Sequence, residues 1–389
     1  MQNEKSISKR TAAVHAGQRR DVVGTVNPIE PSSAYQYIDS GNQYYPRYFN
    51  TPNQNYVNEK LAALEQGESS ILFGSGMAAV CATMMALLKP GEHAVLLENV
   101  YGGTLAFASQ EFSEYGIQFD VAGGTVDALM DAVKPNTRVI FIETPANPLM
   151  QIVDLVELAA AAKKAGIITV VDNTFASPIN QNPIALGIDV VLHSGTKYLG
   201  GHSDLSFGAV ISSHDTVERI RQKAINFGAN INSQTCYLIE RSLKTLSVRV
   251  ERQNENAMSV AKFLQQNEAI SNVFYPGLPD HPGHDIAVKQ MSGFGGMMSF
   301  ELMGDGCPKN FLKDLQIVTP AMSLGGVEST VTMPVHTSHK PMSGEERARL
   351  GISDQLIRLS TGIEDAEDLI ADFEAALAKH AQPSTANVS

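Results

Sequence analysis

Short apolar runs rich in β-branched residues alternate with helix-like segments, and this alternation constrains the fold most. The strand-like runs are residues 70–73, 94–97, 139–142, 168–171 and 190–192. Segments of helical character lie between them, for example 77–88 and 154–165. The pattern predicts an α/β fold with a mostly parallel sheet that helices bury on both faces. Ligands of such sheets bind at the carboxyl ends of the strands.

The chain has 389 residues, which exceeds one ordinary core and predicts a large and a smaller domain. Residues 1–54 have little periodicity and carry five tyrosines, so we expect an arm that packs against another part of the protein or another subunit. We expect the large domain at 55–245 and the small C-terminal domain at 246–389. Residues 236–263 lack Gly and Pro and predict one long linking helix. Further expected elements are short strands at Phe300, Ile317 and 356–357 and a helix at 365–378.

Charge and composition exclude several classes of partner. The formal net charge of -12 and the pI near 5.3 argue against nucleic acid or an anionic membrane as the main partner. No apolar signal core or membrane-spanning stretch is apparent. Cys81, Cys236 and Cys307 are widely spaced and odd in number, which indicates no disulfide framework or zinc cluster and favours the cytoplasm. The histidines show no metal-like spacing, so we expect no metal site.

One lysine, Lys197, follows the last apolar run and is surrounded by small hydroxyl and glycine residues. Ser194 and Thr196 flank it with hydroxyl groups suited to a phosphate. An amine beside a phosphate site fits pyridoxal phosphate held as a Schiff base. Asp172 closes an earlier run, where a buried acid would pair with a protonated pyridine nitrogen. A helix N-cap is the alternative interpretation of Asp172 alone.

The segment 74–79, Gly-Ser-Gly-Met-Ala-Ala, follows a strand and opens a helix, so its backbone amides predict an anion site. The same letters fit the loose dinucleotide pattern G-x-G-x-x-A, with Glu98 placed to bind a ribose. An NAD-dependent enzyme is therefore the main rival. That rival gives Lys197 and Asp172 no role.

Two further side chains have a functional and a structural interpretation. Tyr101 follows the run 94–97, where its ring could stack on a flat cofactor and its phenol could exchange protons, or could simply pack. Arg358 alternates with apolar neighbours, which predicts an inward-pointing arginine on a strand. Its planar fork suits a substrate carboxylate, and a structural salt bridge is the alternative.

Four segments together resemble the Cys/Met metabolism family, the transsulfuration group of pyridoxal-phosphate enzymes. They are residues 143–148, 194–204, 323–329 and 357–365, and the likeness runs from about residue 10 to residue 379. The resemblance implies the fold-type-I, aspartate aminotransferase-like architecture, with a mostly parallel seven-stranded sheet in the large domain and a smaller α/β domain. It also implies a homotetramer, a dimer of dimers with shared active sites.

The resemblance assigns a role to each matching residue. Lys197 would hold the cofactor as a Schiff base, and Tyr101 would stack on the ring and assist proton transfer. Arg358, helped by Asn147 and the Ser323 backbone, would bind the substrate carboxylate, with Met322 beside it. The implied cofactor-binding residues are Tyr45 and Arg47 of the arm, which would reach the neighbouring subunit's phosphate site, and Ser75, Gly76, Met77, Tyr101, Asn147, Asp172, Thr174, Ser194, Thr196 and Lys197.

Three departures from the family bear on the activity. Met322 stands where cystathionine-handling γ-enzymes carry a glutamate for the distal amino group, which makes this chain more similar to methionine γ-lyase. Gly103 stands where methionine γ-lyases often have a cysteine, and the arm segment 45–53 differs from the usual Asn-Pro-Thr. We therefore expect γ-elimination on a γ-substituted L-amino acid, giving a 2-oxo acid and ammonia. The alternatives are γ-replacement, as in cystathionine γ-synthase or O-acylhomoserine sulfhydrylase, and cystathionine cleavage.

Overall fold

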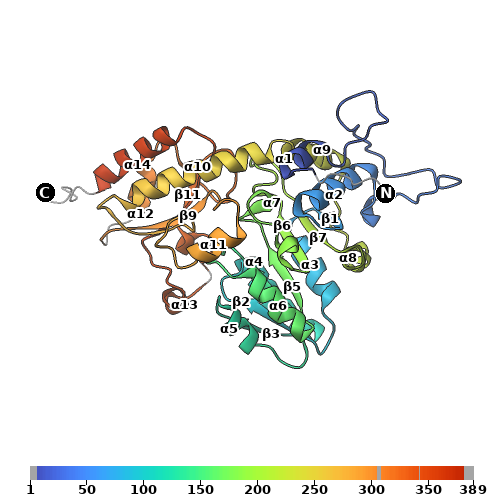
Figure 1. Cartoon of the computed structure of the whole chain (residues 1–389), viewed down its shortest axis with the longest axis horizontal. Coiled ribbons are helices and arrows are strands. Elements are labelled where there is room, and N and C mark those ends of the chain that lie inside the picture. Colours follow the sequence, from blue (N-terminus) through green and yellow to red (C-terminus); the bar gives the residue numbers. More distant parts are fainter. Residues whose placement is uncertain (1–6, 305–307, 341, 381–389) are drawn as a thin grey trace.

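The computed structural model describes residues 7–304, 308–340 and 342–380, and two sheets organise this part of the chain (Figure 1). The larger sheet has seven strands in the order β1-β7-β6-β5-β4-β2-β3. Only β7 runs against its neighbours, which confirms the mostly parallel sheet. The strands are β1 (Ser69–Phe73), β2 (His93–Leu97), β3 (Gln118–Ala122), β4 (Thr137–Glu143), β5 (Ile168–Asp172), β6 (Val190–Ser194) and β7 (Gly208–Ser212).

Helices follow most of these strands and bury the sheet, so the central strands are apolar on both faces. The expected helices at 77–88 and 154–165 are confirmed as α3 (Gly76–Leu87) and α6 (Leu155–Ala165). The other helices around this sheet are α2 (Pro52–Glu65), α4 (Gly102–Glu111), α5 (Val126–Asp131), α7 (Ser177–Asn180), α8 (His214–Phe227) and α9 (Ser233–Leu243), with short 3-10 turns η2 (Ser113–Tyr115) and η3 (Pro183–Leu186).

The second sheet has five strands and its own apolar core around Phe300, Phe311 and Phe373. Its order is β10 (Thr319–Pro320), β11 (Thr330–Thr332), β12 (Leu356–Ser360), β9 (Met297–Leu302) and β8 (Ile270–Phe274). The remaining elements here are α10 (Leu246–Gln265), α11 (His284–Gln290), α12 (Pro308–Asp314), η4 (Pro334–His336), α13 (Gly344–Arg349) and α14 (Ala366–His380). The strands expected at Phe300 and 356–357 and the helix at 365–378 are confirmed.

Two expected elements are wrong. The single helix over 236–263 is broken into α9 and α10, because Arg249 and Thr245 both donate to the Ser242 carbonyl and stabilise the break without Gly or Pro. Ile317 is not in a strand. Asp372 instead accepts the amides of Gln316, Ile317 and Val318, which holds this segment as a turn before β10.

Residues 7–50 form an arm that extends from the end of the molecule opposite the five-stranded sheet (Figure 1). It contains one short helix that the sequence did not predict, α1 (Lys9–His15), and the 3-10 turn η1 (Pro46–Tyr48). Lys60 of α2 stabilises the end of α1 by donating to the carbonyls of Ala13 and Val14. Over the described ranges, none of the helices has the length and apolar character that crossing a membrane requires. Cys307 lies outside those ranges.

Candidate active site

The carboxyl ends of β4, β5 and β6 bring three of the predicted segments together. Glu143 lies in register with Asp172 across β4 and β5, and Asp172 lies in register with Leu192 across β5 and β6. Lys197 follows β6 in a tight turn, in which its amide donates to the Ser194 carbonyl at 3.2 Å. Because parallel strands end at one edge, residues far apart in the sequence meet there.

The Lys197 amine points at a loop of the second sheet. Its Nζ donates to Ser323 Oγ at 2.8 Å, and Ser323 has a left-handed backbone with φ of 81°. Burial and, to a smaller extent, the nearby Arg358 cation lower the pKa of Lys197 to about 8. An appreciable fraction of the amine is therefore neutral near physiological pH, which nucleophilic attack and proton transfer both require.

Asp172 is fixed through one carboxylate oxygen. Oδ1 accepts the Thr174 amide at 2.9 Å and the Thr174 hydroxyl, and that hydroxyl in turn accepts the Ser194 amide at 2.8 Å. Burial raises the pKa of Asp172, and the Thr174 hydrogen bonds and His193 oppose the rise. Across the described residues nothing donates to Oδ2. A protonated ring nitrogen would supply the missing donor and positive charge, so Asp172 fits the implied cofactor.

The start of α3 forms the predicted anion site. Ser75 caps the helix by accepting the Ala78 amide at 3.1 Å, while the amides of Gly76 and Met77 belong to the first turn, which has no partners within the helix. A Cβ on Gly76 would lie 2.9 Å from the Ser194 Cβ, so only glycine lets that serine approach. These neutral donors fit a phosphate. Thr196 lies close by, where its hydroxyl donates to the Phe207 carbonyl at 3.3 Å and accepts the Phe207 amide at 3.2 Å.

Arg358 lies on β12 and is 7% exposed. Its guanidinium donates to Asn147 Oδ1 at 2.9 Å and to the Ser323 carbonyl at 3.3 Å. Burial lowers the pKa of Arg358 to about 10. In the described part of the chain it has no carboxylate within salt-bridge distance, so the structural salt bridge considered above is absent there. A buried, positioned and unpaired guanidinium is suited to a carboxylate ligand. Met322, adjacent to Ser323, is 75% exposed.

Tyr101 occupies the N-cap position of α4, and its side chain is half exposed. Its amide donates to Glu143 Oε1 at 2.5 Å. The ring lies across Gly103, since a Cβ on that glycine would be 2.5 Å from Tyr101 Cε1 and 3.1 Å from Met77 Sδ. Gly103 thus makes room for the Tyr101 ring, which the family resemblance predicts to stack on the cofactor.

The sequence missed two acidic groups near Asp172. Glu143 was visible only as part of a motif, although its position at the end of a strand beside Asp172 was a usable signal. Glu65 of α2 is fully buried and accepts from His193 Nε2 at 2.6 Å and from Asn173 at 2.8 Å. Glu143 and Glu65 both contact residues at the strand ends that carry the predicted site residues, so they belong to the same polar region.

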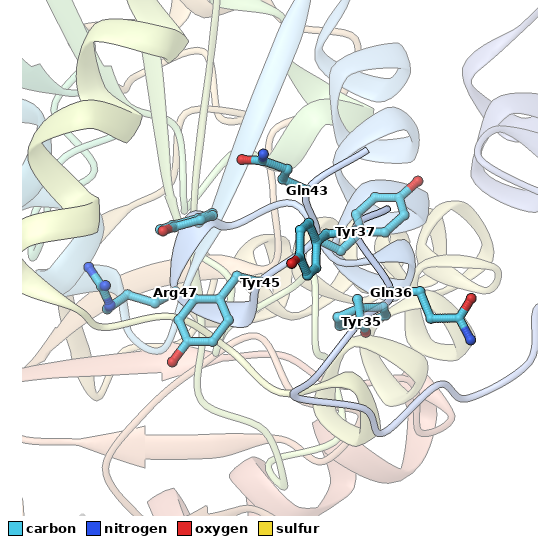
Figure 2. Close-up of a pocket in the computed structure, with 8 residues that line it drawn as sticks. Tyr35, Gln36, Tyr37, Gln43, Tyr45 and Arg47 are labelled. Atoms are coloured by element: carbon cyan, nitrogen blue, oxygen red, sulfur yellow. The ribbon is translucent and has the colours of Figure 1, made fainter. Parts of the chain in front are cut away.

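The arm residues Tyr45 and Arg47 lie apart from this group within the single chain. Arg47 donates to the Ile225 carbonyl of α8 at 2.9 Å, and its guanidinium carbon lies 5.8 Å and 5.6 Å from the ring centres of Tyr45 and Tyr48. Figure 2 shows Arg47 and Tyr45 side by side. They border a cavity of about 300 Å³ that is lined by Tyr35, Gln36, Tyr37, Gln43, Tyr44, Tyr45, Arg47 and Tyr48.

The topology argues against a dinucleotide site at Gly74–Ala79. That motif requires the strands before and after the glycine-rich helix to be neighbours. Here four strands separate β1 from β2, at whose carboxyl end Glu98 lies. Glu98 faces Arg349 at 3.7 Å instead. Within the ranges that the structure describes, no group of three or more His, Cys, Asp or Glu side chains could hold a metal ion.

Comparison with known proteins gives a consistent family. Residues 10–378 match the family model described as Cys/Met metabolism PLP-dependent enzyme. A cystathionine beta-lyase of Lactococcus lactis subsp. cremoris (strain MG1363) is 42% identical over 378 residues, covering 96% of this chain and 99% of that protein. An L-methionine gamma-lyase of Fusobacterium nucleatum subsp. polymorphum is 40% identical over 386 residues, covering 95% and 98%.

A solved structure extends the likeness to three dimensions. The crystal structure of a cystathionine gamma synthase from Xanthomonas oryzae pv. oryzae, in complex with aminoacrylate and cysteine, superposes with a TM-score of 0.92. The two chains are 39% identical, and the match covers 97% of this chain and 99% of the other. Proteins named for three different activities therefore resemble this chain about equally.

Proposed function

The chain belongs to the Cys/Met metabolism family of pyridoxal-phosphate-dependent enzymes, and from that premise we propose that it catalyses γ-elimination on an L-amino acid with a γ-substituent. The products would be a 2-oxo acid and ammonia together with the departing γ group. One observation carries the proposal beyond the family. The partly neutral Lys197 amine and the Arg358 guanidinium both contact Ser323, and the residue before Ser323 is Met322, an apolar side chain that we propose faces the substrate's distal group.

Pyridoxal phosphate, when bound, supplies an aldehyde that condenses with amines and a ring that accepts electrons from the substrate's α carbon. We propose that Lys197 holds it, that Asp172 pairs with its ring nitrogen, and that Asn147 bonds its ring hydroxyl. The first-turn amides of α3, Ser75, Ser194 and Thr196 would bind the phosphate, and Thr174 would act by fixing Asp172.

The residues of this chain have separable tasks in the reaction. Arg358 binds the substrate's α-carboxylate through both arms of its fork, which orients the α carbon toward Lys197. The freed Lys197 Nζ then removes the α proton, and after releasing that proton it is neutral again and removes a β proton. The Tyr101 phenol protonates the leaving γ group. Because Met322 offers no anion to a distal ammonium group, it favours an apolar thioether.

Two alternatives follow from the relatives. The Lactococcus protein is named a β-lyase and the Xanthomonas protein a γ-synthase, so cystathionine cleavage and γ-replacement remain candidates for this site. The three reactions share the Lys197, Asp172 and Arg358 chemistry. They differ in which bond breaks and in whether water or a thiol meets the product.

A substrate panel tests the proposal. Methionine, cystathionine, cysteine and an O-acylhomoserine are each supplied with and without an added thiol, and 2-oxo acid, ammonia and thioether are measured. We expect oxo acid and ammonia from methionine without added thiol. Thioether formed only when thiol is present would indicate replacement instead. Products confined to cystathionine and cysteine would indicate β-elimination.

We also propose a homotetramer in which the arm of one protomer completes the anion site of its neighbour. The exposed arm tyrosines and Arg47 support this proposal. A reducing compartment such as the cytoplasm fits the two described cysteines, Cys81 and Cys236, which are both free thiols.

A further inference from the structure

Tyr101 is held in an unusual way for a residue with a proposed catalytic role. It begins α4 without any side-chain cap, and two glycines, Gly102 and Gly103, follow it. Glycines leave the backbone free to move, so this helix start has little of its own to fix the tyrosine. Its carbonyl accepts the amides of Thr104 and Leu105, but its own amide has no partner within the helix.

Glu143 supplies that partner from a different element. The residue ends β4, is 7% exposed, and its Oε1 accepts the Tyr101 amide at 2.5 Å. A strand end in the centre of a sheet is rigid, so this hydrogen bond ties the start of α4 to the same edge that carries Asp172. We propose that Glu143 is a positioning residue, which places the Tyr101 ring over the cofactor by holding the Tyr101 amide. This inference rests on the proposed role of Tyr101.

The neighbourhood of Glu143 favours its neutral form. Asp172 lies in register beside Glu143 on the neighbouring strand, and two adjacent carboxylates in a largely buried site disfavour double ionisation. Burial raises the pKa of Glu143 well above its usual value, and Asp172 adds to the rise, while the Tyr101 amide opposes it. A glutamine would therefore reproduce both the shape and the charge of the working side chain.

The experiment compares Glu143→Ala with Glu143→Gln, with Glu111→Ala as the matched control. Glu111 is an exposed glutamate at the other end of the same helix. The first readout uses apo-protein: hydrogen exchange of the Tyr101 amide should accelerate about tenfold in Glu143→Ala, because a hydrogen bond that protects it is lost. Glu143→Gln and Glu111→Ala should exchange at the wild-type rate.

The second readout uses holoenzyme. In Glu143→Ala the visible circular dichroism of the bound cofactor should shrink at equal cofactor content, and kcat should fall about tenfold to a hundredfold with little change in KM. Glu143→Gln should restore both. Unchanged exchange, dichroism and kcat in Glu143→Ala would overturn the inference, and so would a Glu143→Gln variant as impaired as Glu143→Ala.

The two hypotheses fail differently. A wild-type protein that binds pyridoxal phosphate but eliminates nothing from the panel would refute the proposed function. The Tyr101 exchange and the cofactor dichroism would still report whether Glu143 holds the tyrosine. The thermal midpoint of each apo-variant separates a local effect from general destabilisation, since Glu143→Gln retains the acceptor and should unfold like the wild type.

Discussion

The group around Lys197 and the N-terminal arm hold their arginines in opposite ways. Arg358 is buried, and Asn147 and Ser323 of the same chain fix its guanidinium. Arg47 lies on the arm, where it contacts one carbonyl and two exposed tyrosine rings. The difference indicates that one chain can build the amine, ring and carboxylate parts of the proposed site. The anion site of that chain offers neutral donors, to which the arm of a neighbour would add a cation.

Substitution of Lys197 should inactivate the part of the proposed site that one chain builds by itself, and it has the largest expected effect. Lys197→Ala removes the amine that we propose holds the cofactor and transfers the protons, so steady-state elimination should fall by at least about 1,000-fold. Oxo acid and ammonia production measure it. Lys164→Ala, an exposed lysine on α6, is the control and should keep wild-type activity. Substantial residual turnover in Lys197→Ala would sink the assignment.

The residues around Lys197 that lie at the ends of strands were predictable from the sequence for a topological reason. Asp172 and Lys197 each follow an apolar run, and parallel strands bring their carboxyl ends to one edge. Gly76 was predictable in the same way, because glycine and hydroxyl residues at a strand-to-helix turn indicate free amides. The positions of Asp172, Lys197 and Gly76 at strand ends are thus enough to predict that they lie at one edge of the sheet.

The other half depended on tertiary structure. Ser323 meets the Lys197 amine across 126 residues of sequence, and only resemblance to a family pointed to it. Glu143 offers its oxygen to a backbone amide, a contact that no side-chain pattern encodes. The prediction of one continuous helix over 236–263 failed for a related reason. Arg249 stabilises the break between α9 and α10 from one turn away, whereas sequence rules look for Gly or Pro at a helix end.

The arm side of the comparison is tested by Arg47→Ala. If Arg47 adds a cation to a neighbour's phosphate, its loss should weaken pyridoxal-phosphate binding about ten- to hundredfold, measured as the cofactor's dissociation constant. Gln36→Ala, which lines the same arm cavity without a charge, should bind the cofactor normally. Equal cofactor affinity in wild type and Arg47→Ala would contradict a role for Arg47 in phosphate binding and leave it only its structural contact with α8.

Mixed oligomers sharpen this result. Each site of a hybrid between Lys197→Ala and Arg47→Ala protomers would take its lysine from one chain and its arginine from the other. One site in each hybrid pair would then be intact. At cofactor concentrations too low to load Arg47→Ala, co-refolded hybrids should regain activity that neither variant shows alone. Failure to regain it in verified hybrids would contradict shared sites.

The smallest expected effect is a shift in the pH dependence of cofactor capture by Lys197, which should differ between Arg358 and Arg47 variants. Covalent capture of the cofactor aldehyde requires neutral Lys197, whose pKa burial and Arg358 lower to about 8, so the capture rate of apo-protein should rise with pH and level off above that value. Arg358→Gln removes the nearby cation and leaves the burial. The pKa of Lys197 should then increase, moving the inflection to higher pH by less than about one unit.

Arg47→Ala is the matched comparison for this measurement, because Arg47 is not among the groups that lower the pKa of Lys197. Its capture rate should be slower at every pH, with the inflection unmoved. Borohydride trapping of the bound chromophore at timed intervals gives the rates. An inflection that shifts in Arg47→Ala, or stays fixed in Arg358→Gln, would reverse the assignment of the two arginines. In the proposed site, burial and the Arg358 cation would together set the protonation state of the Lys197 amine, whereas Arg47 would affect only how firmly the phosphate is held.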